Sequence, residues 1–174
     1  SGAKHSVYVA LMTLCDPGDE VVIAAPYWVS YSEMVKQAGA VPVIVAATEE
    51  ADFKITAEQL DAAITDKTKA IILTSPNNPT GRVFTREELT ELSQFIIKHD
   101  LICVCDQAFE DTAFPGHEMV TMASLPGMWE RTVTVCSCSK GMALSGYRVG
   151  YIFADDVIMD TMYATAVNIQ GAAN

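Results

Sequence analysis

The sequence predicts an α/β domain of three layers, in which helices cover both faces of a mainly parallel sheet. Short apolar runs rich in β-formers alternate along the chain with longer amphipathic patterns, which is the order expected of strand–helix–strand units. The strand candidates are almost continuously apolar, as expected for strands covered on both faces. The chain has 174 residues and is 50% hydrophobic, so one domain with a substantial core is expected.

The expected elements follow one another without a linker or an internal repeat. The expected strands are residues 20–25, 41–45, 69–74, 101–105, 132–136 and 149–154. The expected helices are residues 3–14, 28–38, 56–64, 85–99 and 155–168.

Turn and cap signals mark the borders of these elements. The sequence Asp-Pro-Gly-Asp at residues 16–19 is a strong turn between the first helix and the first strand. Thr56 and Thr85 are each followed three residues later by Gln or Glu, which is the capping-box signature of a helix start. Gly39 stands where the second helix should end, at a position that favours left-handed backbone.

Composition excludes several classes of partner. The formal net charge of -11 argues against nucleic acid or an anionic membrane, because both need a basic surface. The apolar runs are strand-sized, so no membrane span is expected, and no signal peptide is recognised. The chain begins without methionine and stops without a terminating element, so it reads as a piece of a longer protein.

The five cysteines indicate the cellular compartment of the protein and whether it binds a metal. Besides Cys15, they form two C-x-C pairs, Cys103 with Cys105 and Cys136 with Cys138, inside strand-like runs. This spacing puts both thiols of a pair on one face of a strand, and a metal site is one interpretation. Zinc knuckles are usually C-x-x-C on a turn, so buried reduced thiols in a cytoplasmic protein and no metal are the prediction.

Distinctive polar and aromatic residues follow four of the expected strands. Trp28 follows the first, Asn78 the third, Asp106 the fourth and Lys140 the fifth. In open α/β sheets, ligands bind beyond the carboxyl ends of the strands. These residues are therefore expected to converge on one crevice from segments far apart in sequence.

The residue types in this set suggest one ligand. Lys140 could form an imine with an aldehyde, and Arg148 could hold a phosphate together with Ser137 and the helix start at Gly2-Ala3-Lys4. An aldehyde and a phosphate on one small molecule suggest pyridoxal 5'-phosphate (PLP). Each observation also has an interpretation without a ligand. Lys140 could be a solvated surface residue, and one glycine, Gly2, is by itself a weak sign of a phosphate site.

Three further residues suit the ring of such a ligand. Asp106 could pair with a protonated pyridine nitrogen, Asn78 could donate to the phenolate oxygen, and Trp28 could stack on the ring face. Each also has a structural interpretation. Asp106 could cap the next segment, Asn78 could form a turn before Pro79, and Trp28 could pack in the core.

Taken together, these motifs resemble the large, cofactor-binding domain of class I and II PLP-dependent aminotransferases of fold type I, a group that includes bacterial aspartate aminotransferases. They occur in family order and cover essentially the whole chain. The motifs that carry the resemblance are Gly2-Ala3-Lys4, Asp16-Pro17-Gly18-Asp19, Pro26-Tyr27-Trp28-Val29-Ser30-Tyr31, Ser75-Pro76-Asn77-Asn78-Pro79-Thr80-Gly81, Asp106, Ser137 with Lys140, and Gly146-Tyr147-Arg148-Val149-Gly150.

The resemblance implies a role for each residue. Lys140 would be the Schiff-base lysine and proton shuttle, and Asp106 the partner of the pyridinium nitrogen. Tyr31 would support that aspartate. The last strand, residues 149–154, would run antiparallel to the others. The remaining cofactor contacts implied are Asn78 to the ring hydroxyl, Trp28 to the ring face, and Ser137, Arg148 and the backbone at Gly2, Ala3 and Lys4 to the phosphate.

The implied function is that of a cofactor domain, residues 1–174, from an aminotransferase that acts on an amino acid and a 2-oxo acid and is a homodimer when intact. An N-terminal arm and a C-terminal small domain are missing relative to the family, so the chain alone is expected to be inactive. Phe109 stands where the family often has a tyrosine. A C–S β-lyase of the same fold, and the effector domain of an aminotransferase-like transcription regulator, remain alternatives.

Overall fold

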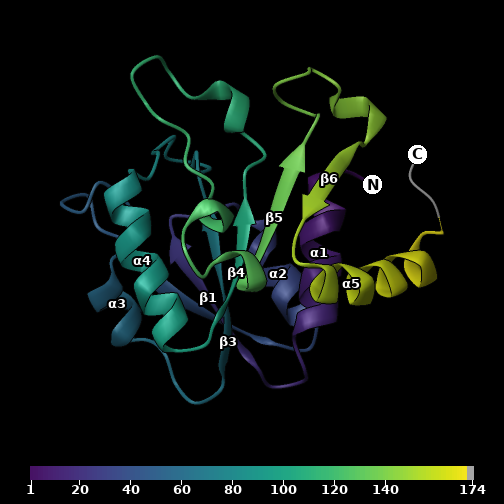
Figure 1. Cartoon of the computed structure of the whole chain (residues 1–174), viewed down its shortest axis with the longest axis horizontal. Coiled ribbons are helices and arrows are strands. Elements are labelled where there is room, and N and C mark those ends of the chain that lie inside the picture. The colour runs from purple at the N-terminus through teal and green to yellow at the C-terminus, as the bar shows by residue number, and fades with distance from the viewer. Residues whose placement is uncertain (172–174) are drawn as a thin grey trace.

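One six-stranded sheet runs through the middle of the molecule (Figure 1). The computed structural model describes residues 1–171. The strand order is β2-β1-β3-β4-β5-β6, and neighbouring strands are parallel except for the antiparallel pair β5 and β6. The predicted sheet, with one antiparallel strand, is thus confirmed. The strands are β1 (Glu20–Ala25), β2 (Val41–Ala46), β3 (Thr68–Thr74), β4 (Ile102–Asp106), β5 (Thr132–Ser137) and β6 (Gly150–Phe153).

Helices cover both faces of the sheet, as predicted. Side chains alternate along each strand, so Val21 and Ile23 point into one core cluster and Val22 into the other. The first cluster lies under α1, α2 and α5, and the second lies under α3, α4 and the segment 120–128. The helices are α1 (Gly2–Leu14), α2 (Ser30–Gln37), α3 (Ala57–Asp61), α4 (Arg86–Lys98) and α5 (Asp156–Ile169).

The predicted caps form as the residue types require. Thr56 and Thr85 each accept a hydrogen bond from the backbone N–H three residues on, and the side chain at that position returns one to the cap backbone. Gly39 follows α2 with a φ of +83°, a conformation that glycine adopts at little cost. The backbone N–H of Asp16 donates to Asp19 Oδ2 over 2.8 Å, which closes the turn before β1.

Two expectations about the elements were wrong in detail. β2 was expected to be covered on both faces, but it lies at the sheet edge, with Val41 48% and Ile44 45% exposed. An apolar run does not distinguish an edge strand from a central one. Trp28 was placed inside the second helix, but α2 begins at Ser30, which leaves Trp28 on the loop that enters it.

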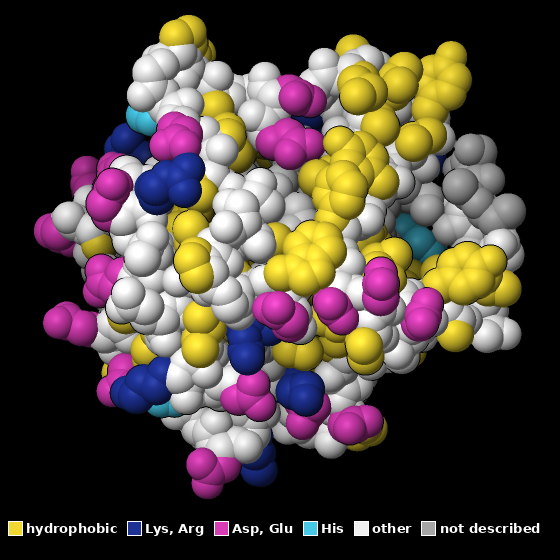
Figure 2. Space-filling model, viewed as in Figure 1, with side chains coloured by type: hydrophobic (Ala, Val, Ile, Leu, Met, Phe, Trp, Pro, Cys, Tyr) yellow, Lys and Arg dark blue, Asp and Glu magenta, His cyan; other side chains and the backbone are white. Residues whose placement is uncertain are grey.

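Exposed hydrophobic side chains gather on one side of the molecule. Figure 2 shows them over β6, the loop before it and α5, whereas the opposite side carries most of the charged groups in this view. Tyr147, Phe153, Val157 and Tyr163 are each more than half exposed. Of the helices within residues 1–171, none has the length and apolar character needed to cross a membrane.

The topology brings several chain ends to one edge of the sheet. β1, β3, β4 and β5 are parallel, so their carboxyl ends lie together. β6 runs the other way, and its first residue, Gly150, pairs with Ser137 at the end of β5. The start of α1 lies against Gly150, because a Cβ on Gly150 would come within 2.7 Å of the Ala3 nitrogen.

Candidate functional site

A pocket opens at this edge of the sheet, and the structure brings nearly all the predicted site residues together around it. The predicted residues that line it are Ala3, Lys4, Trp28, Asn78, Asp106, Ser137, Lys140 and Arg148. Gly2 does not line the pocket but lies directly behind it. Its φ is +75°, a conformation that favours glycine, and a Cβ there would come within 2.6 Å of the Arg148 guanidinium.

Asp106 lies at the carboxyl end of β4 and is only 4% exposed. The Tyr31 hydroxyl donates to its Oδ2 over 2.6 Å, and the Ala108 backbone N–H donates to its Oδ1 over 2.9 Å. Burial nevertheless raises the pKa of Asp106, because losing water costs the carboxylate more than these two hydrogen bonds return. Among residues 1–171, no cationic side chain forms an ion pair with it.

This unpaired buried carboxylate provides a test of the predicted cofactor. A buried charge is stable only when a counter-charge or hydrogen bonds compensate for the lost solvation. Asp106 faces the pocket, so a ligand that brings a protonated ring nitrogen would supply the missing cation. The residues present therefore fit PLP.

The stability of the cofactor-free chain should depend on Asp106 and on pH. Folding raises the pKa of this group above its ordinary value of 3.8, so the folded state retains the proton to higher pH than the unfolded chain. Its contribution to the free energy of unfolding is therefore full below 3.8 and declines as pH rises through the folded pKa. Because folding raises this pKa, the deprotonated carboxylate destabilises the fold relative to its protonated form.

We therefore expect Asp106→Asn to raise the melting temperature of the cofactor-free chain at pH 7 and to raise it less at pH 4. Asparagine can accept from the Ala108 N–H and donate to Tyr31, whose own proton can turn to Thr74. A gain of about 1 kcal/mol corresponds to about 2–4 °C in a domain of this size. Thermal unfolding of both proteins at the two pH values measures it, and an equal difference at both would contradict the explanation.

Thr74 extends the hydrogen-bond network around Asp106, and sequence analysis did not find it. Its Oγ1 lies 2.9 Å from the Tyr31 hydroxyl oxygen. Because Tyr31 donates its proton to Asp106, it accepts from Thr74. Burial and the charge of Asp106 raise the pKa of Tyr31 well above its usual value, so its hydroxyl stays protonated. The available signal was a polar residue at the end of an otherwise apolar strand.

The other end of the pocket is built to bind an anion. The Arg148 guanidinium lies against the start of α1, and its Nη1 donates to the Ser145 carbonyl over 2.9 Å. Within residues 1–171, the N-cap Ser1 makes no side-chain cap hydrogen bond to the first turn of α1, and that turn carries no acidic residue, so its N–H groups can face a ligand. Ser137 is buried beside them. Ser139 and Ser145 also line the pocket and were not predicted.

The reactive lysine candidate lies between these two ends. Lys140 follows β5 on an exposed loop, and its Nζ lies 5.4 Å from the centre of the Phe109 ring. Trp28 forms another wall. Its ring packs edge-on against Tyr31 and under the Nζ of Lys4, 4.8 Å from the ring centre. Phe109 thus lies beside Lys140, and Trp28 lies beside Lys4.

Asn78 is held in the pocket wall by the fold of its loop. The neighbouring Asn77 side chain accepts hydrogen bonds from both the backbone and the hydroxyl of Thr80. Gly81 then turns the chain with a φ of +72°. The Asn-Asn-Pro-Thr-Gly run thus sets a rigid turn, and its second asparagine lines the pocket. The turn and the ligand interpretations of Asn78 are compatible.

The five cysteines are not among the residues that line this pocket. All five are buried and unbridged, as predicted. Burial raises the pKa of Cys15 to about 11 and that of Cys136 to about 12, so both thiols stay protonated. Within the part of the chain that the structure describes, no group of three or more His, Cys, Asp or Glu residues is arranged to hold a metal ion.

Comparisons with known proteins agree with this arrangement. The family model for class I and II aminotransferases matches residues 1–169. An aspartate aminotransferase of Musicola paradisiaca is 41% identical over 171 residues, which cover 98% of this chain and 43% of that protein. An aspartate aminotransferase of Thermus thermophilus, solved with maleate, superposes with a TM-score of 0.94 at 35% identity, covering 99% of this chain and 44% of that one.

A relative named for a different substrate class is also similar in fold. An aromatic aminotransferase of Pyrococcus horikoshii has a TM-score of 0.92 at 38% identity, covering 97% of this chain and 45% of that one. The chain spans less than half the length of each of these relatives.

Proposed function

The chain belongs to the class I and II aminotransferases, and from this membership we propose that it forms the PLP-binding large domain, residues 1–174, of an enzyme that moves an amino group between an amino acid and a 2-oxo acid. The observation that carries the proposal is the pocket itself. A lysine, an unpaired buried carboxylate and an anion-binding end, from segments far apart in sequence, surround one space.

The site residues divide the work of holding the cofactor. When bound, PLP supplies an electron sink for the bonds at the amino-acid Cα. Asp106 would keep a proton on the ring nitrogen, because its buried carboxylate would be more stable next to a cation. Tyr31 and Thr74 hold the carboxylate in place from behind.

The remaining contacts fix the position of the ring and the phosphate. Trp28 would cover one face of the ring, and Asn78 would donate to the ring hydroxyl oxygen. Arg148, Ser137 and the N–H groups at Gly2, Ala3 and Lys4 would bind the phosphate. Since Arg148 is also tied to the Ser145 carbonyl, its guanidinium is oriented before a ligand arrives.

Lys140 carries the chemical step that the protein itself contributes. Its amine would hold the cofactor and, once the substrate is bound, would move the proton at the substrate Cα. Phe109 lacks the hydroxyl of the tyrosine often found at this position in the family. With Asn78 as donor and no tyrosine hydroxyl at residue 109, the ring oxygen would be less stabilised, which would alter the electronics of the site without by itself removing PLP binding.

The next question is which residues would bind the carboxylate of the substrate. A second hollow adjoins the pocket across Asn78 and Phe109, and Arg82 and His117 lie in its lining. The Arg82 guanidinium is ion-paired to Asp52 at 2.8 Å, so it is not free to bind a substrate carboxylate. Such a group would come from outside these residues, and for this reason we propose that the chain is inactive alone. We also propose that the intact protein acts as a homodimer.

Transamination is favoured over the other two functions considered. The relatives described above are aminotransferases by name, and a C–S β-lyase or a regulator is not among them. The proposed location is the cytoplasm, supported by five unbridged buried thiols.

An amino-donor screen tests the proposed function. The full-length protein with PLP and 2-oxoglutarate should form glutamate and a new 2-oxo acid from at least one donor in a panel that includes aspartate and the aromatic amino acids. A β-substituted amino acid should not yield pyruvate and ammonia at a comparable rate. Release of pyruvate and ammonia without glutamate formation would identify a lyase and reject the proposal.

A further inference from the structure

Three consecutive residues after β4 contact the segment that carries Lys140 or the two strands that flank it. We call residues 109–111 the clamp turn and residues 138–149 the lysine loop. The lysine loop is closed on itself, because the Cys138 N–H donates to the Val149 carbonyl and the Leu144 N–H donates to the Cys138 carbonyl. The clamp turn therefore contacts a loop whose shape is held by its own backbone hydrogen bonds.

The closest contact joins Asp111 to Gly141, the residue that follows Lys140. A Cβ added to Gly141 would collide with the Asp111 carboxylate and would lie 2.5 Å from the Asp111 Cβ. Rotating the Asp111 side chain leaves its Cβ in place, so only a shift of one backbone would relieve the collision. Gly141 does not have a positive φ, so the requirement for glycine is steric and arises from Asp111.

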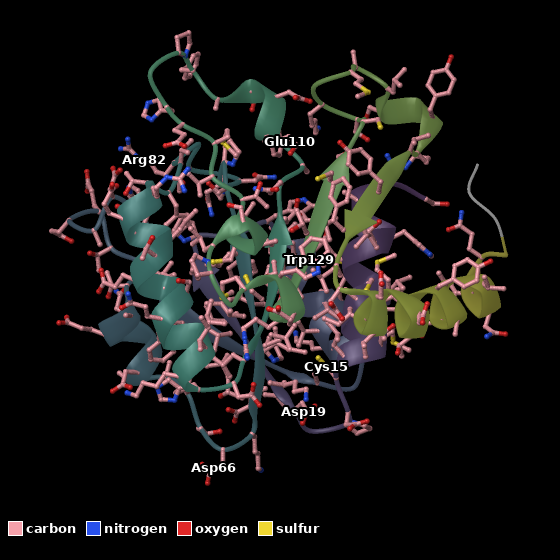
Figure 3. All side chains as sticks on the ribbon, viewed as in Figure 1. Cys15, Asp19, Asp66, Arg82, Glu110 and Trp129 are labelled. Atoms are coloured by element: carbon pink, nitrogen blue, oxygen red, sulfur yellow. The ribbon has the colours of Figure 1, made fainter. Side chains whose placement is uncertain are left out.

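The preceding residue of the clamp turn ties it to the strands on both sides of the lysine loop. Glu110 accepts from the Cys136 thiol over 3.8 Å and from the Tyr151 hydroxyl over 3.4 Å. Figure 3 shows Glu110 at the turn that follows β4, next to the upper ends of β5 and β6. Burial raises the pKa of both donors to about 12, so both keep the protons that they share with Glu110.

The first residue of the clamp turn contacts the lysine itself, since the Phe109 ring lies 5.4 Å from Lys140 Nζ. The turn begins three residues after Asp106. We propose that the clamp turn is a positioning element that fixes Lys140 relative to Asp106, with the Asp111–Gly141 contact as its critical point. This inference rests on the proposed function, in which these two side chains act on one cofactor.

Substituting the glycine tests the proposal. Gly141→Ala should push the lysine loop away from the clamp turn. Borohydride trapping of PLP on Lys140 should slow by about 100-fold, the scale expected of a misplacement near 1 Å. Asp111→Gly in the same protein removes both colliding groups and should restore the rate. Gly146→Ala is the matched control, because Gly146 lies in the same loop with open space around its Cα.

A second readout does not need the cofactor. Amide hydrogen exchange of residues 138–144 in the cofactor-free protein should be faster in Gly141→Ala than in the wild type, and slow again in the double variant. If Gly141→Ala unfolds the protein, Glu110→Ala loosens the clamp turn without a collision and should show the same two changes.

The outcomes separate this inference from the function on which it rests. Trapping on Lys140 in the wild type together with an unchanged rate and unchanged exchange in Gly141→Ala would overturn the clamp and leave the function intact. Failure to trap Lys140 in the wild type would overturn the function. A defect in Gly141→Ala that Asp111→Gly does not rescue would show that the Asp111–Gly141 contact is not the cause.

Discussion

Replacing Lys140 by alanine is expected to abolish amino transfer while leaving the fold intact. The side chain is exposed on a loop, and its loss removes no buried contact. In the proposed mechanism it is both the covalent attachment point and the group that moves the proton at the substrate Cα. A positioned proton-transfer group contributes about 100- to 10,000-fold to a rate, and loss of covalent attachment adds to this.

The measurement is the amino-transfer rate of the full-length protein, with cofactor content determined in parallel. Lys36→Ala is the matched control, since Lys36 is an exposed lysine paired with Glu33 on α2, and it should keep the wild-type rate. Near-normal turnover in Lys140→Ala would make this lysine a solvated surface residue, which was its plain interpretation from the sequence.

Asp106→Asn is expected to lower turnover far more than it lowers the PLP content. The carboxylate stabilises the charge that the ring acquires mainly in the transition state. Removing one such electrostatic contact typically costs about 100- to 1,000-fold in rate. The phosphate contacts and Lys140 remain, so the cofactor should still bind. Rates and cofactor content of the same preparations give the two quantities.

The same substitution is expected to stabilise the cofactor-free chain at pH 7, as argued from the raised pKa of Asp106. Opposite effects on stability and turnover are the signature of a group whose burial serves the site rather than the fold. A variant with normal turnover would mean that Asp106 only caps the segment that follows β4, where it accepts the Ala108 N–H.

Much of the fold could be predicted because its signals are local. The capping boxes at Thr56 and Thr85 depend on residues three apart, and both form. The apolar runs located all six strands. The edge position of β2 could not be predicted in this way, because it depends on which strands pair rather than on the residues within β2.

In the candidate site, too, some residues could be predicted from the sequence and others could not. Lys140 and Asp106 could be placed together because parallel strands bring their carboxyl ends to one edge, and Arg148 follows Lys140 by only eight residues. Thr74 could not, since its role depends on the Tyr31 hydroxyl reaching it from a different segment. The contact between Asp111 and Gly141 joins residues 30 apart in sequence, and neither residue type alone signals it.

The central claim is that Lys140 binds the cofactor, and one measurement tests it most directly. The protein is incubated with PLP, reduced with borohydride and digested, and the modified peptide is identified by mass spectrometry. The predicted result is one major adduct on Lys140 that is absent from Lys140→Ala. An adduct on Lys4, the other lysine that lines the pocket, or on an exposed lysine such as Lys36, with Lys140 unmodified, would contradict the account.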